Sequence, residues 1–116
     1  MTPLDLVEAA GSVLTRPDAV LSSSPVAAAL LARQALEIRL REEWNAKEEP
    51  LSRTNMANQF HALCQLRNPS IAGMAYQTWV SLSGICHHHL YGRMPAFPEV
   101  RQLIESVERL VTLNWH

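Results

Sequence analysis

The chain contains 116 residues, of which 47% are hydrophobic and 18% are charged, and its formal net charge at pH 7 is −1. This length and composition predict one globular domain over residues 1–116, with a core that needs no disulfide or metal support. The nearly neutral balance excludes a strong overall attraction to nucleic acid or to an anionic membrane.

Two helices are predicted in the first part of the chain. The first begins at Pro3 behind a Thr2 cap, and the second begins at Pro25 behind a Ser24 cap and ends near Trp44. Apolar side chains recur at helical spacing in both, which predicts one buried face for each helix. The positions expected to be buried are Leu6, Ala10, Val13, Leu36, Leu40 and Trp44. The charged positions of the second helix that are expected to face solvent are Arg33, Glu37 and Arg41.

Three further helices are predicted after a charged loop over residues 45–53. The third is capped by Ser52 or Thr54, and the Asn-Pro-Ser sequence at residues 68–70 ends it. The fourth runs from about residue 71 to residue 90, and the last follows the Pro95 and Pro98 pair. The inward positions expected in these helices are Met56, Phe60, Leu63, Cys64, Ala72, Ala75, Trp79, Leu82, Cys86, Val100, Leu103, Ile104, Val107, Leu110 and Val111.

The predicted fold class is therefore all-α, a single compact bundle of about five helices. The N-terminus has no basic residue before Arg16, and the longest apolar run, residues 26–32, is too short to span a bilayer. Two cysteines without a secretion signal favour reduced thiols. These features predict a cytoplasmic protein without a membrane partner.

Residues 86–89, Cys-His-His-His, are the most unusual stretch of the chain. Consecutive helical side chains point about 100° apart, so the three histidines cannot act as one cluster. Cys86 continues the inward row, and His87 lies on a flank of the helix. The stretch is typical of a polar helix end, and His87 and His88 are its catalytic candidates. The adjacent side chains of Cys86 and His87 do not meet, which argues against a nucleophile–base pair.

A zinc site is an alternative interpretation of the same stretch. His61 and Cys64 are spaced i, i+3, as are Cys86 and His89, so antiparallel packing of the third and fourth helices would surround a metal with two nitrogens and two thiolates. Neither pair has the tight turn of common zinc modules. The main interpretation includes no metal and no cofactor, because the sequence also lacks a glycine-rich phosphate loop and paired carboxylates.

Two segments resemble a known family. Residues 32–44, ARQALEIRLREEW, are similar to the second helix of HEPN-type domains, and residues 78–111 are similar to their later part. HEPN domains are small helical bundles, frequently dimeric, of RNA-cleaving toxins, defence systems and CRISPR-associated nucleases. The resemblance implies a homodimer or another protein partner, and a bacterial defence or toxin–antitoxin setting.

Active HEPN members carry an arginine four to six residues before a histidine, in a metal-independent ribonuclease site. Residues 79–83, which occupy the matching place, contain no arginine. Arg109 and His116 have the spacing, but they lie at an end expected to be frayed, outside the resembling region. We therefore expect a non-catalytic interaction module. The alternative is a ribonuclease, with RNA as partner, in which a histidine of residues 87–89 is the general acid/base and Arg93 holds phosphate.

One flank of the fourth helix is the predicted subunit contact. Its members, with the two residues that follow the helix, are Tyr76, Val80, Ser83, His87, Tyr91 and Arg93. Protonated imidazole is unfavourable in a buried contact without a partner. A dimer at about pH 8 is accordingly expected to loosen near about pH 5.5.

Overall fold

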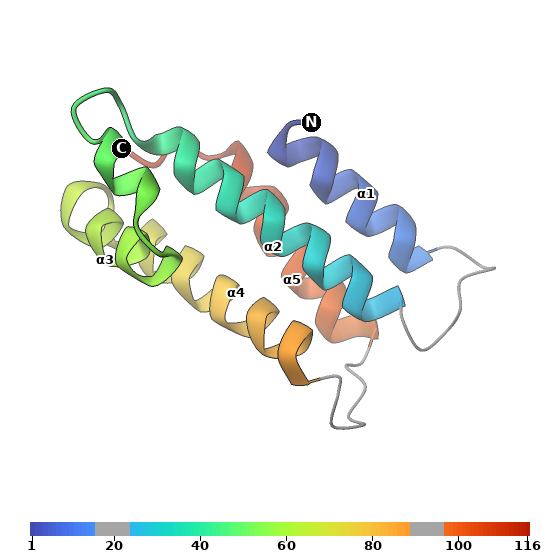
Figure 1. The fold of residues 1–116 in the computed structure, drawn as a ribbon. Coiled ribbons are helices and arrows are strands. Elements are labelled where there is room, and N and C mark those ends of the chain that lie inside the picture. Colours follow the sequence, from blue (N-terminus) through green and yellow to red (C-terminus); the bar gives the residue numbers. More distant parts are fainter. Residues whose placement is uncertain (16–23, 89–96) are drawn as a thin grey trace.

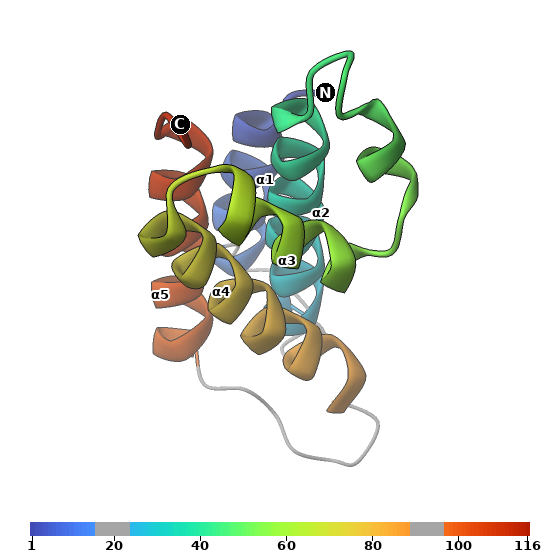
Figure 2. The same ribbon diagram turned by 90° about the vertical axis from the view of Figure 1, so that its left-hand side faces the viewer.

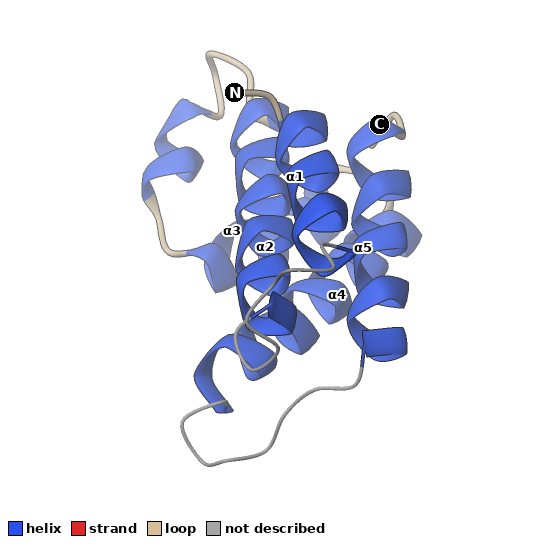
Figure 3. Cartoon of the chain, turned by 90° about the vertical axis from the view of Figure 1, so that its right-hand side faces the viewer, coloured by secondary structure: helices blue, strands red, loops and turns tan. Residues whose placement is uncertain are grey.

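The computed structural model describes residues 1–15, 24–88 and 97–116 (Figure 1). Its elements, in chain order, are α1 (Pro3–Thr15), α2 (Ser24–Glu43), the 3₁₀ helix η1 (Glu49–Arg53), α3 (Met56–Leu66), α4 (Pro69–His88) and α5 (Phe97–Thr112). The described ranges contain no strand (Figure 3). The prediction of an all-α bundle of five helices is confirmed.

Helix α2 occupies the centre of the bundle and contacts each of the other four helices (Figures 1 and 2). A central helix must be apolar over a wide arc, and small side chains allow its neighbours to approach closely. The fully buried positions of α2 are accordingly Pro25, Ala28, Ala29, Ala32, Ala35, Leu36 and Leu40. Helices α1 and α5 cover one side of it (Figure 3), and α4 covers another.

The helix starts follow from side-chain caps. Thr2 Oγ1 accepts a hydrogen bond from the Asp5 amide at 3.1 Å, while Asp5 accepts one from the Thr2 amide at 3.0 Å, so the expected Thr2 cap is confirmed as a reciprocal pair. Helix α3 is capped by Asn55, which accepts from the amide of Asn58, and not by Ser52 or Thr54. Both of those hydroxyls donate to backbone carbonyls in and after η1, inside the stretch expected to be a loop.

The start of α4 also differs from the expectation, because the helix begins at Pro69 and not near residue 71. Asn68 Oδ1 accepts hydrogen bonds from the amides of Ser70 and Ile71, at 2.9 and 3.3 Å. Asn68 is therefore the N-cap and Pro69 the first helical residue, where a missing N–H costs nothing. The expected end of this helix near residue 90 lies outside the described residues.

Most of the expected core is buried; besides Trp79, the members that are only half-buried and packed against it are Val13, Met56, Cys86, Leu103 and Val111. Leu36, Leu40, Phe60, Val107 and Leu110 are all at most 2% exposed, as predicted. Trp79 is only half-buried, and Cys64 is exposed, because α3 turns that side away from the bundle.

The charged positions of α2 that were expected to face solvent also differ from that expectation. Arg33 and Glu37 are half-buried rather than solvated, and Trp79 Nε1 of α4 donates a hydrogen bond to Glu37 at 3.0 Å. Two of the three charged positions thus lie partly against a neighbouring helix, while Arg41 is exposed as expected.

Candidate interaction surface on helix α4

Helix α4 is unusual in its charge. It has 20 residues and contains no aspartate, glutamate, lysine or arginine. Its inner positions Ala72, Ala75 and Leu82 are buried, while Tyr76 and Val80 are each 45% exposed on the outer side. An exposed tyrosine and valine on an uncharged helix form an apolar stripe that the bundle itself does not cover.

Four of the predicted interface residues lie on this stripe, which we name the α4 outer row: Tyr76, Val80, Ser83 and His87. The intervals of four, three and four residues keep the row on one face of the helix. His87 is exposed in the last turn, and Ser83 is half-buried. Tyr91 and Arg93, the other two predicted contacts, lie outside the described residues.

An aromatic cluster supports the row from beneath. Phe60 of α3 packs edge-on against Tyr76, with ring centroids 5.8 Å apart, and lies 5.4 Å from the ring of Trp79. Tyr76 and Trp79 stack at 6.3 Å. Because Trp79 is also hydrogen-bonded to Glu37, the cluster ties α3 and α4 to α2 and limits the rotamers open to Tyr76.

A depression of about 320 Å³ lies beside the row, between α3 and α4. Phe60 and Tyr76 line it with small side chains from both helices, and His61 and Cys64 complete its lining. In the described structure His61 and Cys64 thus border an apolar depression next to the row, and His61 Nε2 also lies 3.4 Å from Gln65 Nε2.

The three described residues of the alternative zinc set, His61, Cys64 and Cys86, are not grouped together. Cys64 lies beside Ala72, since both line the same depression, whereas Cys86 follows Ala72 by fourteen residues in α4. At 1.5 Å per residue this separation is about 20 Å along the helix. Helix α3 does pack on α4, but it has only 11 residues, and its contacts described above reach from Ala72 to Trp79. His89 lies outside the described residues, and within those described no three His, Cys, Asp or Glu side chains are grouped to hold a metal ion.

The thiol of Cys86 is not activated for nucleophilic attack. Burial raises its pKa above the ordinary value, against a smaller lowering effect of Arg33. A thiol with a raised pKa stays protonated near neutral pH and is a weak nucleophile. Of the two catalytic candidates beside it, His87 is exposed, and the side chain of His88 lies outside the described part of the chain.

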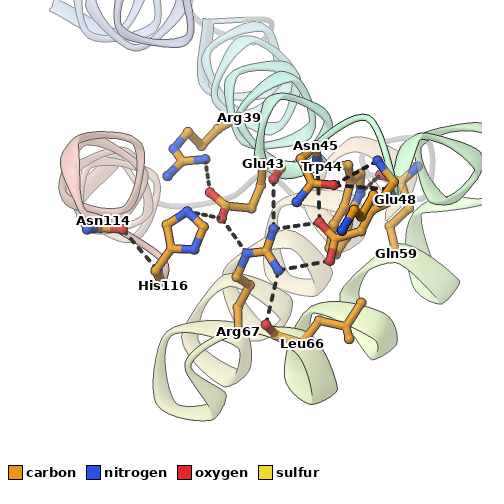
Figure 4. A network of polar contacts seen from close by, with 11 residues as sticks. Arg39, Glu43, Trp44, Asn45, Glu48, Gln59, Leu66, Arg67, Asn114 and His116 are labelled. Carbon is orange, nitrogen blue, oxygen red and sulfur yellow. Dashed lines mark hydrogen bonds and ion pairs between the residues drawn. The ribbon is translucent and has the colours of Figure 1, made fainter.

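A charged network lies at the opposite end of α4, and it was not predicted from the sequence (Figure 4). Arg67, in the connection between α3 and α4, donates to Glu43 Oε2 at 2.6 Å and forms a forked pair with the two oxygens of Glu48, at 2.7 and 3.1 Å. Arg39 donates to the other oxygen of Glu43 at 2.8 Å, and His116 Nε2 lies 3.3 Å from Glu43. The side chains of Arg67 and Glu43 are 8% and 4% exposed.

The charges of this network are paired with one another in a way that stabilises the fold. Burial raises the pKa of Glu43, but the hydrogen bonds from Arg67 and Arg39 outweigh it and hold that pKa below its ordinary value. The hydrogen bonds from Arg67 likewise lower the pKa of Glu48, and both carboxylates raise the pKa of Arg67. Each buried charge is already paired with an opposite charge, which suits holding segments together rather than binding a ligand.

The segment after α5 is held to the bundle through Trp115. The indole of Trp115 is fully buried, its Nε1 donates to the Leu110 carbonyl at 2.8 Å, and the Arg39 guanidinium lies 4.2 Å above its ring. The Trp115 carbonyl accepts a hydrogen bond from the Asn68 amide at 3.2 Å. The expectation of a frayed end was therefore wrong. A large aromatic residue just beyond the last amphipathic helix was the available signal.

The fold and the surface together define an all-α bundle of five helices in which α4 presents an uncharged outer row. No family model, no curated protein and no solved structure matches the chain. Among the described helices, none has both the length and the hydropathy needed to cross a bilayer.

Proposed function

We propose that this protein is a non-catalytic interaction module that pairs with a second copy of itself through the α4 outer row. The observation that carries the proposal is the exposure of Tyr76 and Val80 on a 20-residue helix without a charged side chain. Charged residues are depleted at the centres of protein interfaces, where aromatic residues such as tyrosine are enriched.

The spacing of the row favours a second copy over an unrelated partner. Intervals of four, three and four residues read the same in both directions, so two rows align when the helices run antiparallel. This alignment places Tyr76 opposite His87 of the second copy and Val80 opposite its Ser83. A two-fold interface uses the same patch on both subunits, and an uncharged patch faces its own copy without like-charge repulsion.

The lack of catalysis and the biological setting are parts of the same proposal. The raised pKa of Cys86 and the uncharged surroundings of His87 on α4 support a contact role for this helix end. The resemblance to HEPN-type domains suggests a bacterial defence or toxin–antitoxin system, and the absence of arginine from residues 79–83 argues against their ribonuclease chemistry.

Sedimentation of the Val80→Glu variant tests the pairing. The native chain, of 13.0 kDa, is expected to sediment at twice that mass at micromolar concentration and at about pH 8. The substitution buries two carboxylates in the dimer without partners and is expected to weaken pairing by about a hundredfold. Circular dichroism should be unchanged, because Val80 points away from the core.

Gln102→Glu is the matched control. Gln102 is exposed on α5, and this substitution introduces the same charge as Val80→Glu. It should leave the dimer intact. A native chain that is monomeric throughout, or a loss of pairing that is equal in both variants, would refute the proposal.

An RNA cleavage assay tests the non-catalytic part separately. We expect the purified chain to leave single-stranded RNA intact in the presence of a chelator. Cleavage that disappears when both His87 and His88 are replaced by alanine would favour the ribonuclease alternative. That result would leave the sedimentation outcome unaffected, so the two parts of the proposal fail independently.

A further inference from the structure

The side of α4 that faces α5 carries a second surface feature, separate from the outer row. The two helices run side by side (Figure 2), and a groove of about 650 Å³ follows their junction. Met74 of α4 is 52% exposed, and Leu113, just after α5, is 42% exposed; both line the groove. Gly73 has no side chain and Ser106 has a small one, so the groove stays open between the larger apolar residues.

The charge of the groove is unbalanced. Its lining includes Arg109 and no aspartate or glutamate. Arg33, Arg39 and Arg67 each lie within ion-pair distance of a glutamate. Arg109 is exposed and has no ion-pair partner among the described residues, although Glu105 precedes it by one helical turn. An apolar groove with one uncompensated guanidinium complements an apolar ligand that carries a carboxylate.

We infer that this groove binds an amphipathic helical segment of another protein, with an aspartate or glutamate of that segment paired to Arg109. The walls are helices whose backbone groups are bonded internally, so they offer no edge to an extended strand. The α4 wall, from Ser70 to Thr78, is about 12 Å long, which matches two to three turns of a docked helix. A single arginine in a chain of net charge −1 does not suit a nucleic-acid backbone.

This inference does not depend on self-association through the outer row. Met74 and Val80 lie on different sides of the exposed half of α4, about 120° apart at 100° per residue. A helical segment in the groove therefore contacts Met74 and Leu113, and it leaves the row through Val80 accessible to a second copy.

The probe is a displayed library of helix-forming peptides of about twelve residues, selected on the full native chain. We expect enrichment of apolar residues at i and i+4 together with one acidic residue. A synthetic peptide with the enriched sequence should bind about tenfold more weakly to Arg109→Ala than to the native chain in a fluorescence anisotropy titration. Selection on Arg109→Glu should enrich lysine or arginine at the position of the acidic residue.

Three further variants make the result decisive. Met74→Glu should abolish binding, because it places a charge on the apolar wall. Arg101→Ala, an exposed arginine of the same helix outside the groove, should bind the peptide normally, as should Val80→Glu. A library without enrichment, or an enriched peptide that binds Arg109→Ala and Met74→Glu as tightly as the native chain, overturns the inference.

Discussion

Replacement of Arg67 by alanine is expected to lower the free energy of unfolding by about 3 kcal/mol at neutral pH. The side chain of Arg67 is 8% exposed and is the main partner of Glu43, which is itself 4% exposed. Without the guanidinium, Glu43 keeps only Arg39 and His116 nearby, and Glu48 loses its forked pair. The cost is large because a buried carboxylate left short of partners loses its hydration without full compensation. Urea unfolding followed by tryptophan fluorescence measures it.

The exposed pair formed by Arg53 and Glu49 provides the control. Its atoms approach to 2.8 Å, as closely as in the network, but its side chains are 76% and 53% exposed. Arg53→Ala should therefore change the free energy of unfolding by at most about 0.5 kcal/mol. If the two substitutions lowered the free energy of unfolding equally, the burial of the Arg67 network would contribute nothing to stability.

The pH dependence of stability follows from the same carboxylates. The pKa values of Glu43 and Glu48 are lowered in the folded chain, from an ordinary value of 4.5. Their contribution is thus fully present above about pH 4.5 and is lost as the pH falls through the lower folded values. The difference in free energy of unfolding between the native chain and Arg67→Ala should therefore become smaller below about pH 4.5. If this difference were constant from pH 7 to pH 3, the ion pairs of Glu43 and Glu48 would not be the source of the stability that Arg67 provides.

Replacement of Trp115 by alanine is expected to cost about 3 to 5 kcal/mol, as truncation of fully buried aromatic side chains does. The indole is 0% exposed, stacks under the Arg39 guanidinium and donates to the Leu110 carbonyl. Its removal leaves a cavity and also frees Arg39, which holds Glu43 and the Leu113 carbonyl. Thermal unfolding by circular dichroism measures the loss.

Trp115→Phe and His116→Ala separate the contributions. Phenylalanine keeps most of the volume but loses the Nε1 hydrogen bond, so its cost should be roughly 1 to 2 kcal/mol. His116 is 67% exposed, and its removal should cost under about 1 kcal/mol. If Trp115→Ala were as mild as His116→Ala, the Trp115 indole would not be part of the packed core.

Local sequence signals were sufficient to predict the five helices, although not every cap. The Thr2 cap and the start of α2 near Ser24 and Pro25 depend on residues within one helical turn, so a short stretch of sequence is enough to predict them. The same is true of the outer row: helical geometry alone places Tyr76 and Val80 on one flank, and both are exposed there. The cap of α3 was misassigned because Ser52, Thr54 and Asn55 are all capable caps, and η1 engages the first two.

The all-α class, the approximate helix boundaries and the uncharged face of α4 could be predicted, because these depend on periodicity and on neighbours within a few residues. Which distant groups meet depends instead on how the helices pack against one another. The pairing of Arg67 with Glu43 joins residues 24 positions apart, and the bond from Trp79 to Glu37 joins residues 42 apart. Periodicity marks a polar stripe but cannot say whether water or another helix will face it. Because α2 is central, Glu37 meets Trp79 of α4. The position at which the short α3 packs on α4 keeps Cys64 away from Cys86.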